Sequence, residues 1–181
     1  MDSALLPYQL SNYLPSGKPF NTKDITFARI STDAQNCQPG DLFIAIVSAS
    51  GDGHDQIDVA VKNGAVGILA ERVLPIHTPM VLVQDTRTAY SRLNQALHGN
   101  PTASLTTITV TGTNGTRAFT HLLSHVYNQC GIQTGVIAPS VKTLDGPVTD
   151  RYTASLKNLQ ASGCDTVILA VSPAELASRI Y

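Results

Sequence analysis

The sequence contains no tryptophan and only three cysteines among its 181 residues. These cysteines, Cys37, Cys130 and Cys164, are odd in number and far apart, which argues against both a disulfide framework and a Cys-x-x-Cys zinc site. Cys130 and Cys164 lie in apolar stretches, so we predict that both are buried packing residues rather than nucleophiles. We therefore expect a reduced, cytoplasmic protein.

Charge is also scarce, since charged residues make up 14% of the chain and the formal net charge is −1. No run of lysine or arginine is present, so we do not expect the basic surface that nucleic-acid binding needs. No apolar stretch is long enough to span a membrane, and the first residues lack the basic start and the apolar stretch of a signal peptide. With 43% hydrophobic residues, the chain has enough apolar material for one large core or two small ones.

Apolar runs alternate with helical patterns along the first half, which is typical of α/β architecture. The predicted helices there are 3–13, 54–63 and 87–98, and the predicted strands are 25–30, 42–47, 66–70 and 80–83. The turn residues Gly99-Asn100-Pro101 then break the pattern. We place a domain boundary there, between a domain of residues 1–100 and one of residues 101–181.

The second half has fewer strands. The predicted strands are 105–110, 134–138 and 166–171, the predicted helices are 118–130, 153–162 and 173–180, and a loop is expected around 145–150. Typical sheets have about five or six strands, so this sheet looks unfinished. An unfinished sheet exposes an edge and apolar faces, which invites pairing with a protein partner or with a second copy of the chain.

The segment Thr111–Arg117 reads Thr-Gly-Thr-Asn-Gly-Thr-Arg and lies between a predicted strand and a predicted helix. This is the context of a phosphate-binding loop, but such a loop needs Gly-Lys-Ser/Thr, and here Gly115 is followed by Thr116 and Arg117. The candidate nucleotide-binding residues are Gly112, Thr113, Asn114, Gly115, Thr116 and Arg117. Two interpretations stay open: a degenerate turn that binds nothing, or a residual anion site at the helix N-terminus.

Two other groups of polar residues resemble metal ligands. His121 and His125 are four apart and share a helix face, but no third ligand is near in sequence, so a surface or packing pair is the better interpretation. The spacing of Asp52, Asp55 and Asp58 fails the pattern of a calcium loop. We predict instead that Asp52 and Asp55 favour the start of the following helix, and we predict no metal site.

Several short segments, taken in order, resemble one family. They are Ser31–Asp33, Pro39–Phe43, Asp52–Asp55, Asp85–Arg87, Gly99–Pro101, Thr111–Gly115, Gly163–Asp165 and Val171–Ser172. Together they resemble the Mur ligases, and among these the type that adds the third residue to the UDP-MurNAc peptide. The resemblance implies an α/β Mur-ligase N-terminal domain followed by a partial P-loop-type domain with a parallel sheet. It also implies ATP-dependent amide formation, with ATP and Mg²⁺ as cofactors and a UDP-MurNAc peptide as substrate.

The chain departs from this family where charge matters. Thr116 stands at the position of the P-loop lysine, and Arg117 stands at the position of the hydroxyl residue that follows it. The magnesium-binding glutamate falls at Ala170, and a histidine falls at Ala174, with Pro173 where a serine would stand. Two unit charges about 4 Å apart interact by about 4 kcal/mol at an effective dielectric near 20. We therefore expect no catalytic residues and little ligase activity, and neither ATP nor Mg²⁺ is a certain ligand.

The precursor-binding half is altered too. The family's Asp-Ser-Arg reads Asp33-Ala34-Gln35, which loses a hydroxyl and a cation. By resemblance, the remnant precursor-binding residues are Ser31, Asp33, Ser48 and Ser50. For Ser31 and Asp33 two interpretations stay open: remnants of a uridine site, or polar residues that close a strand.

The family's third, C-terminal domain has no counterpart in the sequence. Because shortening a chain would not remove a lysine and a glutamate, we expect a naturally truncated, inactive relative that binds a UDP-linked precursor, an anion or a protein partner. The alternative is a nucleotide-binding part that works with a partner supplying the missing domain and the lysine.

Overall fold

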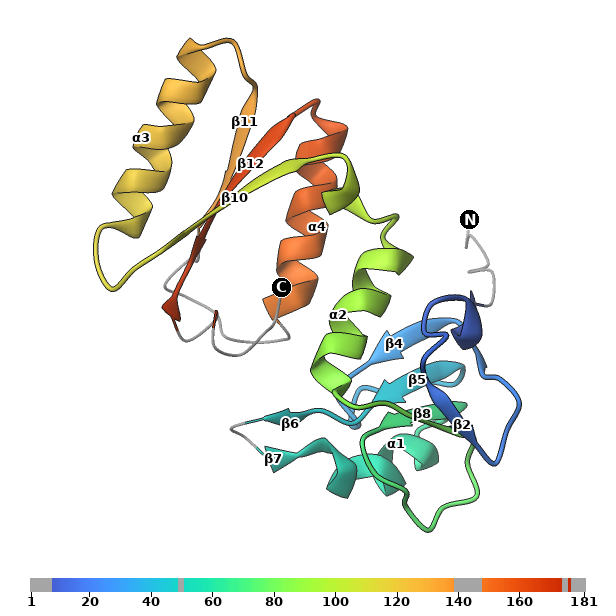
Figure 1. Ribbon diagram of the computed structural model, residues 1–181. Helices are drawn as coiled ribbons and strands as arrows, with labels where there is room; N and C mark the ends of the chain where they lie inside the picture. The colour runs from blue at the N-terminus through green and yellow to red at the C-terminus, as the bar shows by residue number, and fades with distance from the viewer. Residues whose placement is uncertain (1–7, 49–50, 139–147, 174–175, 177–181) are drawn as a thin grey trace. The chain divides into compact units, whose positions relative to one another are not determined.

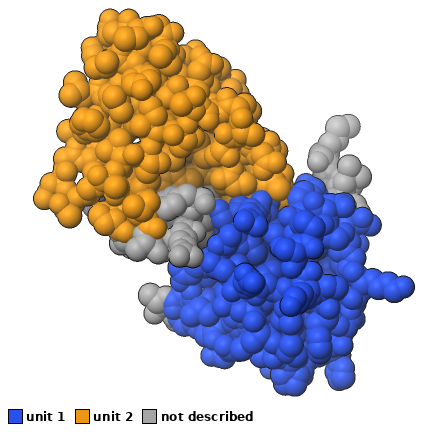
Figure 2. Space-filling model, in the orientation of Figure 1, with its two compact units in different colours: residues 1–93 blue, residues 94–181 orange. Residues whose placement is uncertain are grey.

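The structure is a computed structural model that describes residues 8–48, 51–138, 148–173 and 176. The chain divides into two compact units, residues 1–93 and 94–181 (Figure 2). The division falls inside helix α2 (Thr86–Leu97), earlier than the boundary expected near residue 100. In the described part of the chain, no helix combines the length and the apolar character needed to cross a bilayer.

The first unit is built on a five-stranded sheet in the order β2-β9-β8-β5-β4 (Figure 1). Its strands are β2 (Lys18–Phe20), β4 (Arg29–Ser31), β5 (Asp41–Ile44), β8 (Gly67–Ala70) and β9 (Met80–Leu82). The last four are parallel, and β2 runs antiparallel to β9. β5 and β8 are buried along their whole length, as expected for inner strands of a parallel sheet. The carboxyl ends of the four parallel strands therefore lie along one edge of the sheet.

The predicted helix over 3–13 is wrong for its described residues. β1 (Tyr8–Gln9) pairs antiparallel with β3 (Thr26–Phe27), and only the short 3-10 turn η1 (Leu10–Asn12) follows. The ring of Tyr8 packs 5.7 Å from that of Phe27, centroid to centroid, and 6.0 Å from that of Tyr13. Strand pairing and aromatic packing thus override the helical spacing of the apolar residues. Residues 3–7 of the predicted helix lie outside the described part.

Two predicted strands are shorter than expected. The stretch 25–30 is split into β3 and β4, because the backbone N–H of Ala28 between them donates to Gly40 O at 2.9 Å. The stretch 42–47 ends as β5 at Ile44, and a separate hairpin follows. In that hairpin β6 (Val47–Ser48) pairs antiparallel with β7 (Gly51–Asp52).

The predicted helix over 54–63 is present in two pieces. The 3-10 turn η2 (Gly53–Gln56) leads into α1 (Ile57–Lys62). Asp52 caps η2, since its Oδ1 accepts the backbone N–H of His54 at 2.9 Å, which confirms the predicted role of Asp52 at this helix start. Asp55 lies within the first turn of η2.

The second unit contains a three-stranded parallel sheet in the order β10-β12-β11. The strands are β10 (Thr106–Thr111), β11 (Thr134–Ile137) and β12 (Thr166–Val171), and η3 (Pro101–Ala103) precedes the first. Helices α3 (Thr116–Gln129) and α4 (Val148–Ala161) lie on opposite faces of this sheet (Figure 1). Three strands were predicted, and three strands form the sheet of the described residues.

Helix α4 begins five residues before the predicted start at 153, so the expected loop over 145–150 is wrong for residues 148–150. Tyr152 and Leu156 of α4 form a buried cluster with Val167, Leu169 and Val171 of β12. This packing supplies the reason for the longer helix. Residues 145–147, and most of the predicted helix over 173–180, lie outside the described part.

Helix α3 is covered much less than α4. Phe119, Leu122 and Val126 are 53%, 61% and 49% exposed. Cys130, at the end of the same helix, is also exposed, and Cys164 is partly exposed. The prediction that Cys130 is buried is therefore wrong, because this side of the helix is largely open to solvent in the described part of the chain.

Candidate functional site

Polar side chains follow each parallel strand at the carboxyl edge of the first sheet. Asp33 follows β4, Asp52 and His54 follow β5, Glu71 follows β8 and Thr86 follows β9. In open α/β sheets this edge is the usual place for a ligand. The polar side chains of this edge are therefore the candidate site of the first unit.

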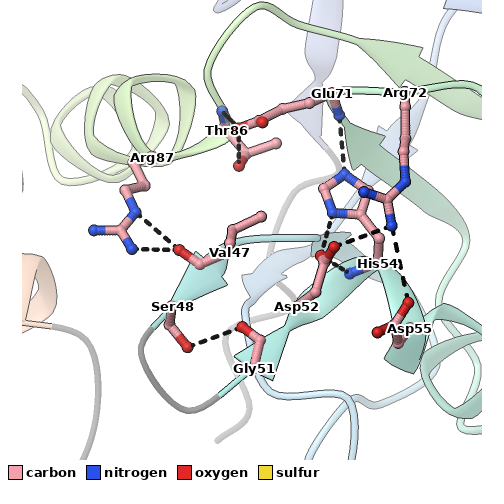
Figure 3. Close-up of polar contacts among 10 residues, drawn as sticks. All are labelled: Val47, Ser48, Gly51, Asp52, His54, Asp55, Glu71, Arg72, Thr86 and Arg87. Atoms are coloured by element: carbon pink, nitrogen blue, oxygen red, sulfur yellow. Dashed lines mark hydrogen bonds and ion pairs between the residues drawn. The ribbon is translucent and has the colours of Figure 1, made fainter.

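His54 is buried, at 4% exposure, and uses both ring nitrogens. Its Nε2 accepts the backbone N–H of Glu71 at 3.1 Å, and its Nδ1 lies 2.6 Å from Asp52 Oδ1 (Figure 3). Because Nε2 accepts, we assign the ring hydrogen to Nδ1, which donates it to the carboxylate. His54 therefore joins the hairpin to the end of β8.

Asp52 is held in its charged form. The backbone N–H of His54, its imidazole and the Arg72 guanidinium together lower the pKa of Asp52 to about 2. Arg72 Nη2 lies 3.0 Å from Asp52 Oδ2 and 3.8 Å from Asp55 Oδ1. Arg72 remains 53% exposed, so it presents part of its guanidinium to solvent at this edge.

The N-terminus of α2 is capped by two carboxylates. Glu71 Oε1 accepts from both the backbone N–H and the hydroxyl of Thr86, each at 2.8 Å. Asp85 Oδ1 accepts the backbone N–H of Arg87 at 2.9 Å and that of Thr88 at 3.2 Å. Since these amides already have acceptors, the start of α2 is not an open anion site.

Arg87 ties the same helix to the hairpin. Its Nε donates to the Val47 carbonyl at 3.1 Å, and its Nη2 donates to the same oxygen (Figure 3). Within the hairpin, the Ser48 hydroxyl donates to the Gly51 carbonyl at 3.3 Å. The first turn of α2 thus reaches across to β6.

Of the predicted precursor-binding residues, Ser31 and Asp33 lie at this edge, where they make local hydrogen bonds. The Ser31 hydroxyl accepts the Asp33 N–H at 3.3 Å and donates to the Asp33 carbonyl at 3.0 Å. Asp33 Oδ1 accepts the Gln35 N–H at 2.9 Å, and its Oδ2 accepts from Asn36 Nδ2 at 2.8 Å. These bonds support the interpretation that Ser31 and Asp33 close the turn after β4. Ser48 lies in β6, and Ser50 lies outside the described residues.

Two residues at this turn differ from the family, and one of them is buried whereas the other is exposed. Ala34, where the family's serine would stand, is fully buried in the first unit's core, so its methyl group serves packing. Gln35, where the family's arginine would stand, is exposed. The position that lacks the family's arginine, residue 35, is therefore exposed to solvent.

Sequence reasoning missed Glu71, Arg72 and Arg87 as members of this site. The signal was present, because Glu71 directly follows a buried strand and Arg87 belongs to the Asp85–Arg87 segment that matched the family. What could not be seen was that these residues meet the hairpin of residues 47–52 in space.

The glycine loop of the second unit joins the end of β10 to the start of α3, as its sequence context predicted. Gly115 adopts φ +75° at the N-cap of α3, a conformation that glycine tolerates best. No side chain caps this end, and the first turn carries no acidic residue. Gly112, Thr113 and Asn114 form the turn that leads to it, and Arg117 is exposed in the first helical turn. Thr116, which holds the lysine position, accepts the hydroxyl hydrogen of Thr120 at its carbonyl.

Ala170 lies inside the second sheet. It pairs in register with Val110 and is 1% exposed. Its neighbours Leu169 and Val171 pack with α4, so alternation along the strand directs Ala170 to the face that α3 covers. A methyl group therefore occupies the position where the resemblance implies a metal-binding carboxylate. Ala174 lies outside the described residues.

The histidines of α3, His121 and His125, are both exposed, as expected for a surface pair. In the described ranges, His, Cys, Asp and Glu side chains form no group of three or more that could hold a metal ion.

Curated sequences similar to this chain match most of its length. No family model matches the sequence. The chain is 34% identical over 179 residues to the UDP-N-acetylmuramoyl-L-alanyl-D-glutamate–2,6-diaminopimelate ligase of Bacillus velezensis, which covers 93% of this chain and 35% of that protein. The corresponding ligase of Geobacillus thermodenitrificans is 41% identical over 108 residues, covering 60% of this chain and 22% of that protein.

Solved structures show the same fold. MurF from Acinetobacter baumannii superposes with a TM-score of 0.60 at 20% identity, over 93% of this chain and 36% of that one. A UDP-N-acetylmuramoyl-L-alanyl-D-glutamate–2,6-diaminopimelate ligase gives a TM-score of 0.67 at 19% identity, over 95% and 37%. MurF from Thermotoga maritima, solved in complex with ADP, gives 0.52 at 25% identity, over 80% and 32%.

The two α/β units, one with a mostly parallel and one with a parallel sheet, therefore define a Mur-ligase fold. The chain is related to the Mur ligases, as its ordered sequence segments predicted, and it spans about a third of the length of the curated relatives it matches.

Proposed function

We propose that this chain is a catalytically inactive relative of the Mur ligases that retains binding of a UDP-linked muropeptide precursor in its first unit. The proposed loss of catalysis is supported by the identity of the side chains in and near the glycine loop. Thr116 and Arg117 stand where a P-loop has lysine and a hydroxyl residue, and the buried methyl group of Ala170 replaces a carboxylate.

Phosphoryl transfer depends mostly on positioning and on neutralising charge around the phosphates. The loop backbone still offers glycine geometry, but without the lysine it supplies no fixed cation to the phosphates. Without a carboxylate at residue 170, it also lacks the proposed magnesium ligand. Arg117 is exposed and can attract an anion to the start of α3, but attraction alone does not activate a carboxylate substrate.

Loss of catalysis is tested by titrating the chain with ATP and Mg²⁺ in a calorimeter, beside an assay for ATP-dependent amide formation. We expect no measurable heat at millimolar ATP and no product. The double variant T116K/R117S restores the loop and should gain measurable ATP binding. Gln129→Lys places a new lysine at the opposite end of α3 and should not gain ATP binding. Robust amide formation by the unaltered chain would overturn the proposal.

Precursor binding is supported by the polar carboxyl edge of the first sheet and by the names of the relatives, which act on a UDP-linked substrate. Arg72 places a half-exposed guanidinium group at this edge, where Gln35 has lost the family's cation. Titration with UDP-N-acetylmuramoyl-L-alanyl-D-glutamate should therefore give saturable binding, and UDP alone should bind more weakly. Absence of saturation at millimolar precursor would contradict this part of the proposal.

A second candidate function is a nucleotide-binding part that works with a partner. It is supported by the exposed apolar side chains of Phe119, Leu122 and Val126 on α3. It is also supported by β10, which pairs only with β12 among the described strands. Size-exclusion chromatography with light scattering tests it. Self-association or complex formation would favour this candidate, whereas a monomer at all concentrations would count against pairing with a second copy.

A further inference from the structure

Both strands of the β6–β7 hairpin are tied to the first turn of α2, at the end of the hairpin where Val47 pairs with Asp52. On β6, the Val47 carbonyl accepts two donors from Arg87. On β7, Asp52 bonds His54, His54 bonds the Glu71 backbone, and the Glu71 side chain bonds Thr86 (Figure 3). Since Thr86 and Arg87 are adjacent in sequence, both sets of hydrogen bonds connect the hairpin to the same point of α2.

Burial alone cannot explain where this hairpin lies. Both residues of β6 are exposed, as is Gly51 of β7, and Val47 is 44% exposed. Two strands of two residues each contribute few backbone bonds, and an isolated hairpin of any length is marginal in water. The polar ties therefore have the larger part in fixing β6 and β7 at the carboxyl edge.

The two ties differ in chemistry. Arg87 brings two N–H groups of one planar guanidinium to a single oxygen, and the flexible ammonium group of lysine does not reproduce this geometry. His54 needs one nitrogen to donate and the other to accept, which only the neutral ring does. Each tie is thus specific to its residue rather than to charge in general.

We propose that Arg87 and His54 are positioning residues that hold β6 and β7 in the arrangement that receives the UDP-linked ligand. The inference rests on the proposed function of the first unit. Holding a loop in its bound form lowers the entropic cost of binding, so weakening a tie should reduce affinity without removing any direct ligand contact.

The experiment uses Arg87→Met, with Arg92→Met as its control, because Arg92 is an exposed arginine on the same helix. A change at buried His54 risks unfolding the unit, so Arg87 carries the test. Amide hydrogen exchange is measured on the ligand-free protein, at the backbone of β6 and β7. Affinity for UDP-N-acetylmuramoyl-L-alanyl-D-glutamate is then measured by calorimetry.

We expect Arg87→Met to speed exchange in β6 and β7 about tenfold and to weaken binding about tenfold, which corresponds to about 1.4 kcal/mol. Exchange in β5 and β8 should stay unchanged, and Arg92→Met should match the unaltered protein in both measurements. Arg87→Lys should recover part of the protection.

The two possible failures are distinguishable. Unchanged exchange in Arg87→Met overturns the positioning role even if the unaltered protein binds the precursor. Faster exchange with unchanged affinity overturns the ligand role of the hairpin. An unaltered protein that fails to bind the precursor overturns the proposed function, and with it the ligand role, whatever the exchange result.

Discussion

At the scale of single residues, an ion pair between buried Asp41 and half-exposed Arg29 joins two neighbouring strands. Asp41 is 1% exposed, and its carboxylate accepts from Arg29 Nε at 3.0 Å and from Arg29 Nη2 at 2.8 Å. The backbone N–H of Gln38 also donates to Asp41 at 2.8 Å. The pair therefore fixes β4 against β5, and this hydrogen-bonded carboxylate raises the pKa of Arg29.

Arg29→Met should lower the free energy of unfolding by about 3 kcal/mol, because it leaves the Asp41 carboxylate buried without its cation. Urea denaturation measures the change, and Arg92→Met is again the matched control. A loss below about 1 kcal/mol would mean that solvent reaches Asp41 and that the pair contributes little.

The lowered pKa of Asp52 gives a second prediction at this scale. Its folded pKa is about 2, and the ordinary value for aspartate is about 3.9. A carboxyl group whose pKa falls on folding stabilises the protein above the unfolded pKa, and this contribution is lost as the pH falls toward the folded pKa. The stability from Asp52 should thus be complete above about pH 5 and decline between about pH 4 and pH 2.

The measurement is the midpoint of thermal unfolding against pH, for the unaltered protein and for Asp52→Asn. The difference between the two should shrink as the pH falls through this window. A constant difference from pH 6 to pH 2 would show that Asp52 does not titrate as its contacts imply.

At the scale of elements, two helices end at glycines with left-handed backbone but different surroundings. Gly64, after α1, has φ +103°, and a Cβ there would lie 2.8 Å from Pro39 Cα. Gly99, after α2, has φ +81° with open space around the same position. Both glycines have the left-handed conformation that is common after a helix, but only Gly64 lies close to another backbone segment, at Pro39.

Gly99→Ala should therefore destabilise the protein by about 1 kcal/mol, through backbone conformation alone. Gly64→Ala should cost about 3 kcal/mol, because a steric clash adds to the same conformational term. Urea denaturation of both variants measures the difference. Equal losses would mean that the chain near Pro39 shifts to accept the methyl group.

At the scale of the whole molecule, the two units have separate cores of unequal completeness. The first unit has a five-stranded sheet with a large buried cluster. The second has three described strands, and α3 exposes large apolar side chains. Exposed apolar area of this kind contributes little to stability, so the second unit should be the weaker one.

We expect unfolding in urea to depart from a single two-state transition. Amides of β10 and β11 should lose protection from hydrogen exchange at lower urea than those of β5 and β8. Coincident loss of protection in all four strands would show that the units unfold together.

Local patterns accounted for most of the elements. The buried strands β8 and β12 and helix α2 lie within about two residues of their predicted ranges, because apolar periodicity reports them directly. The glycine loop lies where its strand–turn–helix context placed it. Tyr8–Gln9 was wrongly predicted to be helical, and the separate strand Val47–Ser48 was not predicted, because both depend on pairing with other segments of the chain.

By itself, the sequence determined the α/β class, the order of the main strands and helices, the relation to the Mur ligases and the altered residues Thr116, Arg117 and Ala170. These features are readable because they depend on local periodicity and on residue identity at ordered motifs. Only the tertiary structure decided how the carboxyl edge is assembled. Arg87 meets a carbonyl 40 residues earlier, and the Glu71 backbone N–H meets a ring 17 residues earlier. Such contacts follow from which strands lie side by side in the sheet, and no local pattern along the chain contains that information.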